Sequence, residues 1–148
     1  MTAQSFMDLA LKQAEIAESA GEVPIGCVIV RDGKVIAQAG NRTLADRDPT
    51  AHAEILAIRE AARVTGSERL TDCDLYVTLE PCTMCAGAIS FARIRTLHFA
   101  ASDPKMGGVL HGGRFFEQPT CHSRPQVESG VLADESSAML KAFFRARR

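Results

Sequence analysis

Two short apolar runs, Ile25–Val30 and Val35–Ala39, flank the dipeptide Asp32-Gly33. Both runs contain several β-branched residues, and Asp-Gly accepts the positive φ angles that tight hairpin turns require. The pattern therefore predicts an antiparallel β-hairpin between residues 25 and 39. Any sheet that includes this hairpin contains at least one antiparallel pair of strands.

Helices and further strands are predicted to alternate after the hairpin. The predicted helices run from Ser5 to Gly21, from an N-cap at Thr50 to a stop at Gly66, over Cys82–Ala92, and from about Asp134 to Arg148. The further strands are Asp74–Leu79 and Thr96–Ala100. This order predicts an α/β fold, a three-layer α-β-α sandwich whose central mixed sheet is antiparallel at the hairpin and parallel through the helical crossovers.

The chain has 148 residues, so we expect residues 1–148 to form one domain around one core. Hydrophobic residues make up 46% and charged residues 24% of the chain, which excludes disordered, collagen-like and disulfide-scaffold classes. Apolar runs stay shorter than the roughly 18 residues of a membrane span, and the first residues lack a signal-peptide pattern. We therefore expect a cytoplasmic protein with no membrane partner.

Residues 102–130 interrupt the alternation with repeated glycines and prolines. An irregular stretch of this length in a compact domain is usually functional or flexible. We therefore expect this segment to form the rim of a site.

Two short motifs stand at the starts of successive predicted helices. Cys82 and Cys85 follow Pro81 and are three residues apart, so one helical turn places both thiols on one face, where backbone N–H groups favour the thiolate. His52 lies at the start of the preceding helix. Two thiolates and one imidazole give zinc three protein ligands and leave the fourth tetrahedral position for water. We expect one zinc ion per chain.

Glu54 is the candidate catalytic residue. Because His52 and Glu54 are two residues apart, they do not share a helix face, and both reach one metal only if the ion lies beyond the helix end. Zinc would lower the pKa of a bound water towards ~7. A carboxylate beside that water can carry its proton to a ring nitrogen and then to a leaving amine. These residues together predict hydrolytic deamination.

Other interpretations of these residues stay open. C-x-x-C alone is also typical of a thioredoxin-like redox pair, or of half a structural zinc site completed by Cys121-His122. H-x-E and the proline before Cys82 disfavour both. A non-catalytic, zinc-stapled RNA-binding module is a further alternative, and Glu54 counts against it. Asn41, just after the hairpin, is either a turn residue or a hydrogen-bonding partner for a base edge.

The chain resembles the bacterial tRNA-specific adenosine deaminases over nearly its whole length. The resembling stretches are Glu22–Gly26, Gly40–Arg42, Asp48–Ile55, Leu75–Ala86 and Phe143–Arg148. H-x-E followed by P-C-x-x-C is itself the known signature of zinc nucleobase deaminases. The resemblance implies a cytidine deaminase-like fold, a homodimer, and conversion of adenosine to inosine at the wobble position of a tRNA anticodon. Between Met106 and Gln126 the chain departs from the family's pattern.

The resemblance also implies roles for individual residues. It makes His52, Cys82 and Cys85 the zinc ligands, Glu54 the proton shuttle and Asn41 a contact to the flipped base. It places Asp103 and Lys105 at the RNA-facing rim. The implied substrate is a tRNA anticodon stem-loop, and the alternative is a small-molecule deaminase acting on guanine, cytosine or cytidine, because related enzymes use the same zinc ligands.

The net charge of −1 excludes attraction of RNA by an overall positive field. Basic residues are instead concentrated near the C-terminus, where residues 138–148 contain no acid. The candidates for phosphate contacts are Lys105, Arg124, Lys141, Arg145, Arg147 and Arg148. The alternative for the last three is that they only solvate the end of the final helix.

Overall fold

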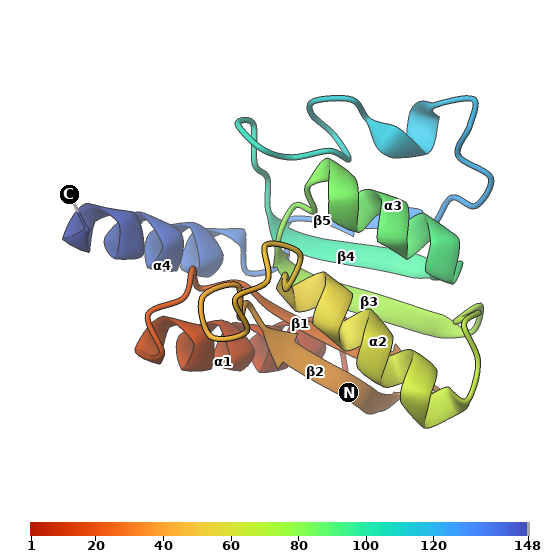
Figure 1. Cartoon of the computed structure of the whole chain (residues 1–148), viewed down its shortest axis with the longest axis horizontal. Helices are drawn as coiled ribbons and strands as arrows, with labels where there is room; N and C mark the ends of the chain where they lie inside the picture. The colour runs from red at the N-terminus through yellow and green to blue at the C-terminus, as the bar shows by residue number, and fades with distance from the viewer. Residues whose placement is uncertain (148) are drawn as a thin grey trace.

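The computed structural model describes residues 1–147, so the predicted phosphate contact of Arg148 lies outside the described residues. Its centre is a five-stranded sheet with the strand order β2-β1-β3-β4-β5 (Figure 1). The strands are β1 (Gly26–Arg31), β2 (Lys34–Gly40), β3 (Cys73–Leu79), β4 (Thr96–Ala101) and β5 (Gln126–Ser129). β1 is antiparallel to β2 and β3, whereas β3, β4 and β5 are mutually parallel. The predicted mixed sheet is confirmed.

The predicted hairpin is the β1–β2 pair. Asp32 and Gly33 have φ angles of 52° and 74°, so both turn residues are left-handed, as a type I′ turn requires. Arg31 pairs with Lys34 directly across the turn, and the register shifts between Ile29 and Val30. The Asp-Gly dipeptide therefore sets the connection that the sequence predicts.

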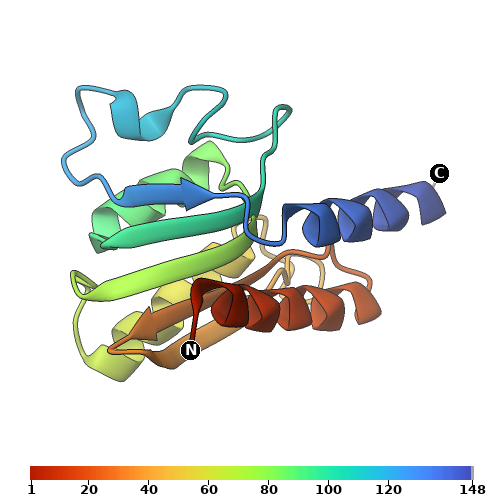
Figure 2. The ribbon, with the colours of Figure 1, turned by 180° about the vertical axis from the view of Figure 1, so that it is seen from behind.

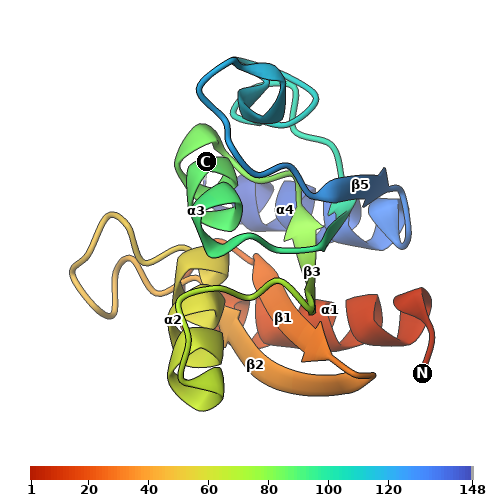
Figure 3. The same cartoon turned by 90° about the vertical axis from the view of Figure 1, so that its right-hand side faces the viewer.

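Helices cover both faces of the sheet. They are α1 (Ala3–Ser19), α2 (Ala53–Thr65), α3 (Thr83–Ala92) and α4 (Ala133–Ala146), with a short 3-10 helix, η1 (Phe115–Glu117). α2 and α3 lie on one face, and α1 and α4 lie on the other (Figures 2 and 3). α4 extends beyond the end of the sheet. This arrangement confirms the predicted three-layer sandwich.

Alternate residues of the central strands form two cores. Ile29 and Val77 pack with α2 and α3, whereas Val28 and Tyr76 pack with α1. The period-two alternation of a strand sends neighbouring side chains to opposite faces, so β1 and β3 need apolar residues at nearly every position. Gly26 allows α1 to approach β1, because a Cβ there would lie 1.9 Å from the carbonyl oxygen of Ala10.

Two predicted helix starts are wrong by a few residues. α1 begins at Ala3 with Thr2 as its N-cap, earlier than Ser5, and the Thr2 hydroxyl accepts from the Ser5 N–H. α2 begins at Ala53 with His52 at the N-cap position, not Thr50. Thr50 is instead engaged by Asp48, whose carboxylate accepts both the Thr50 N–H and its hydroxyl. Because its hydroxyl is bonded to Asp48, Thr50 does not cap α2.

The segment 102–130 is less irregular than expected, because it contains η1 and β5. β5 is short, and only Val127 among its four residues is even partly buried. Within residues 1–147, no helix is long and apolar enough to cross a membrane.

Several strands begin or end at the same edge of the sheet. β2, β3, β4 and β5 all end at this edge, and β1 starts there, because of the pairing directions. The loops that follow β2 and β3 lead into the N-termini of α2 and α3. Residues just after these strands and at these helix starts therefore lie near one another.

Candidate metal centre and active site

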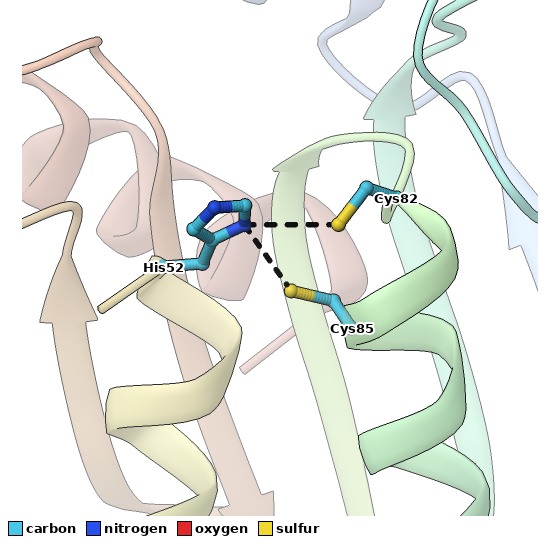
Figure 4. Close-up of side chains that lie close together, drawn as sticks. All are labelled: His52, Cys82 and Cys85. Carbon is cyan, nitrogen blue, oxygen red and sulfur yellow. Dashed lines mark hydrogen bonds between the residues drawn. The ribbon is translucent and has the colours of Figure 1, made fainter. Parts of the chain in front are cut away.

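The N-termini of α2 and α3 bring His52, Cys82 and Cys85 together. His52 and Cys82 are the N-cap residues of α2 and α3, and Cys85 lies in the first turns of α3. Nδ1 of His52 lies 3.7 Å from Sγ of Cys82 and 3.5 Å from Sγ of Cys85 (Figure 4). Neither N-cap side chain bonds its own helix, so both are directed towards this cluster.

The geometry of this cluster fits zinc. The three ligand atoms all lie within 4.8 Å of one another. With the usual Zn–N and Zn–S bond lengths and tetrahedral angles, the nitrogen and each sulfur would be about 3.6 Å apart, close to the separations observed. Three protein ligands of this chemistry suit tetrahedral N/S coordination with one open position.

In the metal-free protein, hydrogen bonds among the three side chains shift the pKa of each of them. A hydrogen bond from the Cys85 thiol, supported by one from His52, lowers the pKa of Cys82 to about 4. The same bond and burial raise the pKa of Cys85 far above its ordinary value. The hydrogen bond with Cys82 raises the pKa of His52. Cys82 is therefore a thiolate near neutral pH, ready to bind a cation.

Glu54 lies beside these ligands in the first turn of α2 and is only 4% exposed. Its pKa is raised to about 7, mainly by burial and also by the negative charge of Cys82, while a backbone hydrogen bond and the charge of His52 oppose the shift. A carboxylic acid with a pKa near 7 can both accept and release a proton at neutral pH. Glu54 and His52 line the same cleft, as expected if both act beyond the helix end.

The proposed second half of a structural zinc site is not assembled. Among residues 1–147, His52, Cys82 and Cys85 are the one group of three or more potential ligands that could share an ion. Cys121 is buried elsewhere, 3.4 Å from the Ser90 hydroxyl and close to the carbonyl of Ser123. The alternative that joined Cys121-His122 to Cys82 and Cys85 is therefore wrong.

A cleft of about 940 Å³ opens over the cluster. Its walls include the apolar side chains Val23, Ile25, Leu79, Leu140 and Phe144. Its polar lining includes Asn41, Thr43, His52, Glu54, Glu80, Cys82, Asp103, Lys105, Lys141 and Arg145. The structure thus brings every site residue expected from the sequence into one cleft, with Cys85 buried just beneath it.

Asn41 has a structural contact as well as a place in the cleft. Its side-chain oxygen accepts the N–H of Ala53 at 2.8 Å, and the residue is buried. Asn41 therefore satisfies the first N–H of α2, the task expected of Thr50. Its amide nitrogen stays available as a donor to a ligand. The structural role of Asn41 is therefore to bond the start of α2, which differs from the turn role considered for it, and its contact to a base stays a prediction.

Asp103 and Lys105 lie on a tight turn after β4. The Asp103 carboxylate accepts the N–H groups of Lys105 and Met106 at 3.1 and 3.0 Å. These two hydrogen bonds fix the backbone of the turn at the edge of the cleft. The Lys105 side chain is exposed beside the cleft.

The candidate phosphate-binding residues fall into two groups. Lys105, Lys141 and Arg145 line the cleft. Arg124 donates instead to the carbonyls of Phe116 and Gln118, and the Arg147 guanidinium lies 3.5 Å from the centre of the Phe143 ring. Arg124 and Arg147 are therefore engaged within the chain and lie outside the cleft lining, contrary to expectation.

Glu80 is the main residue of the cleft that the sequence interpretation left without a role. It connects β3 to α3 and is 3% exposed, and its carboxylate accepts hydrogen bonds from the segment after β4. Glu22 has a comparable task in the loop after β2, where it accepts the N–H groups of Leu44 and Ala45. The position of Glu80 directly before Pro81 and Cys82 could have marked it as a residue of the site. Its hydrogen-bond partners could not be predicted, because they are distant in sequence.

The comparisons with known proteins agree with this geometry. Residues 1–101 match the family model for the cytidine and deoxycytidylate deaminase zinc-binding region. The chain is 59% identical over 143 residues to a tRNA-specific adenosine deaminase of Agrobacterium fabrum, covering 97% of this chain and 94% of that protein.

Solved structures show the same fold. One, from studies of A-to-I editing by tRNA:A34 deaminases at the wobble position of transfer RNA, superposes with a TM-score of 0.91 at 60% identity, covering 92% of this chain and 99% of that one. The guanine deaminase of Bacillus subtilis superposes with a TM-score of 0.67 at 32% identity, covering 98% and 95%. The predicted cytidine deaminase-like fold is confirmed.

Proposed function

Because the chain belongs to the bacterial tRNA-specific adenosine deaminases, within the cytidine and deoxycytidylate deaminase family, we propose that it converts adenosine to inosine at the wobble position of a tRNA anticodon. The observation that carries this proposal is the single cleft that joins three zinc-type ligands, a buried carboxyl and a basic rim. The whole chain, residues 1–148, would act as one zinc-dependent deaminase domain.

The ligand cluster and Glu54 divide the chemistry between them. His52, Cys82 and Cys85 would hold a zinc ion, which when bound would supply a Lewis acid to activate water for attack on the base. Glu54, with a pKa of about 7, would take one proton from the attacking water and deliver it to a ring nitrogen. It would then carry the second proton, from the hydroxyl group now bonded to the ring carbon, to the amine, which leaves as ammonia.

The cleft suits one unpaired base of an RNA loop. Apolar walls offer surfaces for a flat ring, and the free amide of Asn41 can donate to the base. Extruding a base that is already unpaired costs little, which favours an anticodon loop over paired RNA. Lys105, Lys141 and Arg145 surround the opening and would hold the phosphates on either side.

A small-molecule deaminase is less well supported. Identity to the Bacillus subtilis guanine deaminase is 32%, against 59% and 60% for the tRNA deaminases. A free base also gives no reason for cations on α4 at the opening. The non-catalytic zinc module is disfavoured, because such a site gains nothing from a buried acid such as Glu54.

We also infer a homodimer that forms through α3. Its sequence, TMCAGAISFA, has no charged residue, yet Met84 is 37% exposed and Phe91 is 83% exposed. An apolar surface of this kind on a helix is typical of a protein interface. Replacing Phe91 with glutamate should shift the chain from dimer to monomer in sedimentation, and an unchanged dimer would place the interface elsewhere.

The cytoplasm is the compartment that we propose. The two cysteine ligands act as thiolates, and a reducing compartment keeps them free of disulfide bonds.

The experiment that tests the function measures inosine formation. An anticodon stem-loop with adenosine at the wobble position is compared with the same stem-loop with that adenosine moved into the paired stem, and with free adenosine, cytidine and guanine. We expect inosine only from the first RNA. Deamination of free guanine or cytidine without action on the stem-loop would assign the chain to small-molecule substrates.

A further inference from the structure

The carboxylate of Glu80 is completely enclosed, with none of its side chain exposed. It lies at the junction between β3 and α3, two residues before the zinc-type ligand Cys82. A buried charge at this position requires several hydrogen-bond donors, since an unpaired buried carboxylate is costly.

The donors all come from one distant segment. Oε1 accepts the N–H of Asp103 at 3.0 Å and faces Nδ1 of His111 at 2.8 Å. Oε2 accepts the N–H groups of Val109, Leu110 and His111 at 3.1, 2.9 and 3.2 Å. These five contacts span residues 103–111, which contain no helix or strand. We refer to residues 103–111 as the rim loop.

The rim loop is also attached around the carboxylate. Gly107 packs directly against Glu80, because a Cβ there would lie 2.3 Å from Oε2. Its N–H donates to the carbonyl of Asp103, and the N–H of Gly108 donates to the carbonyl of Pro81. The loop thus folds around Glu80 and is tied to the residues that directly precede Cys82.

This attachment matters because the rim loop carries part of the substrate cleft. Asp103, Lys105 and Met106 line the cleft, whereas the ligands and Glu54 lie on α2 and α3. Without a fixed link, an irregular loop would hold these three side chains in many positions relative to the reacting centre. Glu80 provides that link, since one carboxylate contacts the loop at both its beginning and its end.

We propose that Glu80 is a positioning residue for RNA binding, and that with His111 it fixes the rim loop relative to the metal ligands. This inference rests on the proposed function, because it assumes that the rim loop contacts the RNA. Glu80 acts through the loop, so its loss should weaken binding much more than it slows the chemical step.

The chemistry of the contacts predicts what each substitution does. In Glu80→Gln the size is kept, but only one side-chain oxygen remains to accept. If that oxygen accepts the N–H groups of Val109, Leu110 and His111, the new amide nitrogen faces the N–H of Asp103. Both of these groups are donors, so no hydrogen bond forms between them. The beginning of the loop is then released. His111→Ala removes one contact to Oε1 and leaves the backbone contacts in place.

The test compares Glu80→Gln and His111→Ala with the parent enzyme in its zinc-loaded form. The control is Glu117→Gln, which makes the same chemical change at an exposed residue that forms a long ion pair, 3.8 Å, with the exposed Arg114. For the stem-loop we expect KM to rise about tenfold in Glu80→Gln and about threefold in His111→Ala, as loss of charge-assisted hydrogen bonds implies. We expect kcat within about threefold of the parent.

Two further measurements make the result specific. Zinc content should stay at one ion per chain, and amide hydrogen exchange in residues 103–111 should become faster in both variants but not in the control. An unchanged KM in both variants, or unchanged exchange in the rim loop, would overturn the inference. If Glu80→Gln fails to fold, His111→Ala decides the outcome.

Failure of the proposed function would look different. The parent enzyme would then form no inosine from the stem-loop, whereas hydrogen exchange would still report whether Glu80 holds the rim loop.

Discussion

Glu54 should lower the stability of the metal-free protein while serving the reaction. The residue is 4% exposed, and mainly burial raises its pKa from an ordinary value of 4.5 to about 7. A raised pKa means that the folded state prefers the protonated acid. Glu54→Gln replaces the carboxyl with a neutral group of nearly the same shape, so it removes this preference without leaving a cavity.

The size of the effect follows from the two pKa values. Below pH 4.5 the acid is protonated in both the folded and the unfolded chain, and its ionisation costs nothing. As the pH rises to 7, the unfolded chain releases the proton and the folded chain holds it, so the parent loses stability; above pH 7 the loss is constant. The full difference is about 3 kcal/mol, of which about 2 to 3 kcal/mol develops between pH 5 and pH 8.

The assay is urea unfolding of reduced, chelator-treated protein at pH 5 and pH 8. The stability of Glu54→Gln relative to the parent should increase by about 2 to 3 kcal/mol from pH 5 to pH 8. Any cost of burying the amide is independent of pH and cancels in this comparison. With zinc restored, the variant should keep its metal and lose turnover by roughly 10²–10⁴-fold. A stability difference that does not change with pH would refute the argument.

Three other changes test separate parts of the site. Cys85→Ser should abolish zinc binding in elemental analysis while Cys121→Ser keeps one ion per chain, and the reverse result would contradict the ligand assignment. Asn41→Ala should lower the free energy of unfolding by about 1–2 kcal/mol, because the Ala53 N–H loses its acceptor; an unchanged denaturation midpoint would show that the contact contributes nothing. Truncation after Phe144 should flatten the dependence of stem-loop affinity on salt without changing zinc content, and equal slopes would exclude the C-terminal residues from RNA binding.

The sequence was sufficient to predict the hairpin, the three-layer order and the zinc-type ligands, because each depends on local patterns. Asp32-Gly33 encodes its own turn, and C-x-x-C after Pro81 encodes two thiols on one helical turn. His52 joins them because the loops after successive strands lead to helix starts at one edge of the sheet. These relations follow from chain direction and need no knowledge of side-chain packing.

The remaining features depend on contacts between distant residues. β5 has only one partly buried side chain, so it lacks the alternation that identifies a strand. Four of the five partners of the Glu80 carboxylate are backbone amides at least 23 residues away, and backbone amides leave no trace in a sequence. The N-cap of α2 was misplaced partly for a similar reason, because the Ala53 N–H is bonded by Asn41, 12 residues away, while the Thr50 hydroxyl is bonded locally to Asp48.

The direction of β5 has a consequence for how this enzyme can diversify. Because β5 runs parallel to β4, the chain leaves the sheet on the side of the metal ligands, and α4 begins there. An antiparallel last strand would have delivered α4 to the opposite side, far from the reaction. Four residues of α4, namely Leu140, Lys141, Phe144 and Arg145, therefore line the cleft without being ligands. We expect substitutions at these four positions to change which substrate the cleft accepts while the ligands and Glu54 stay in place.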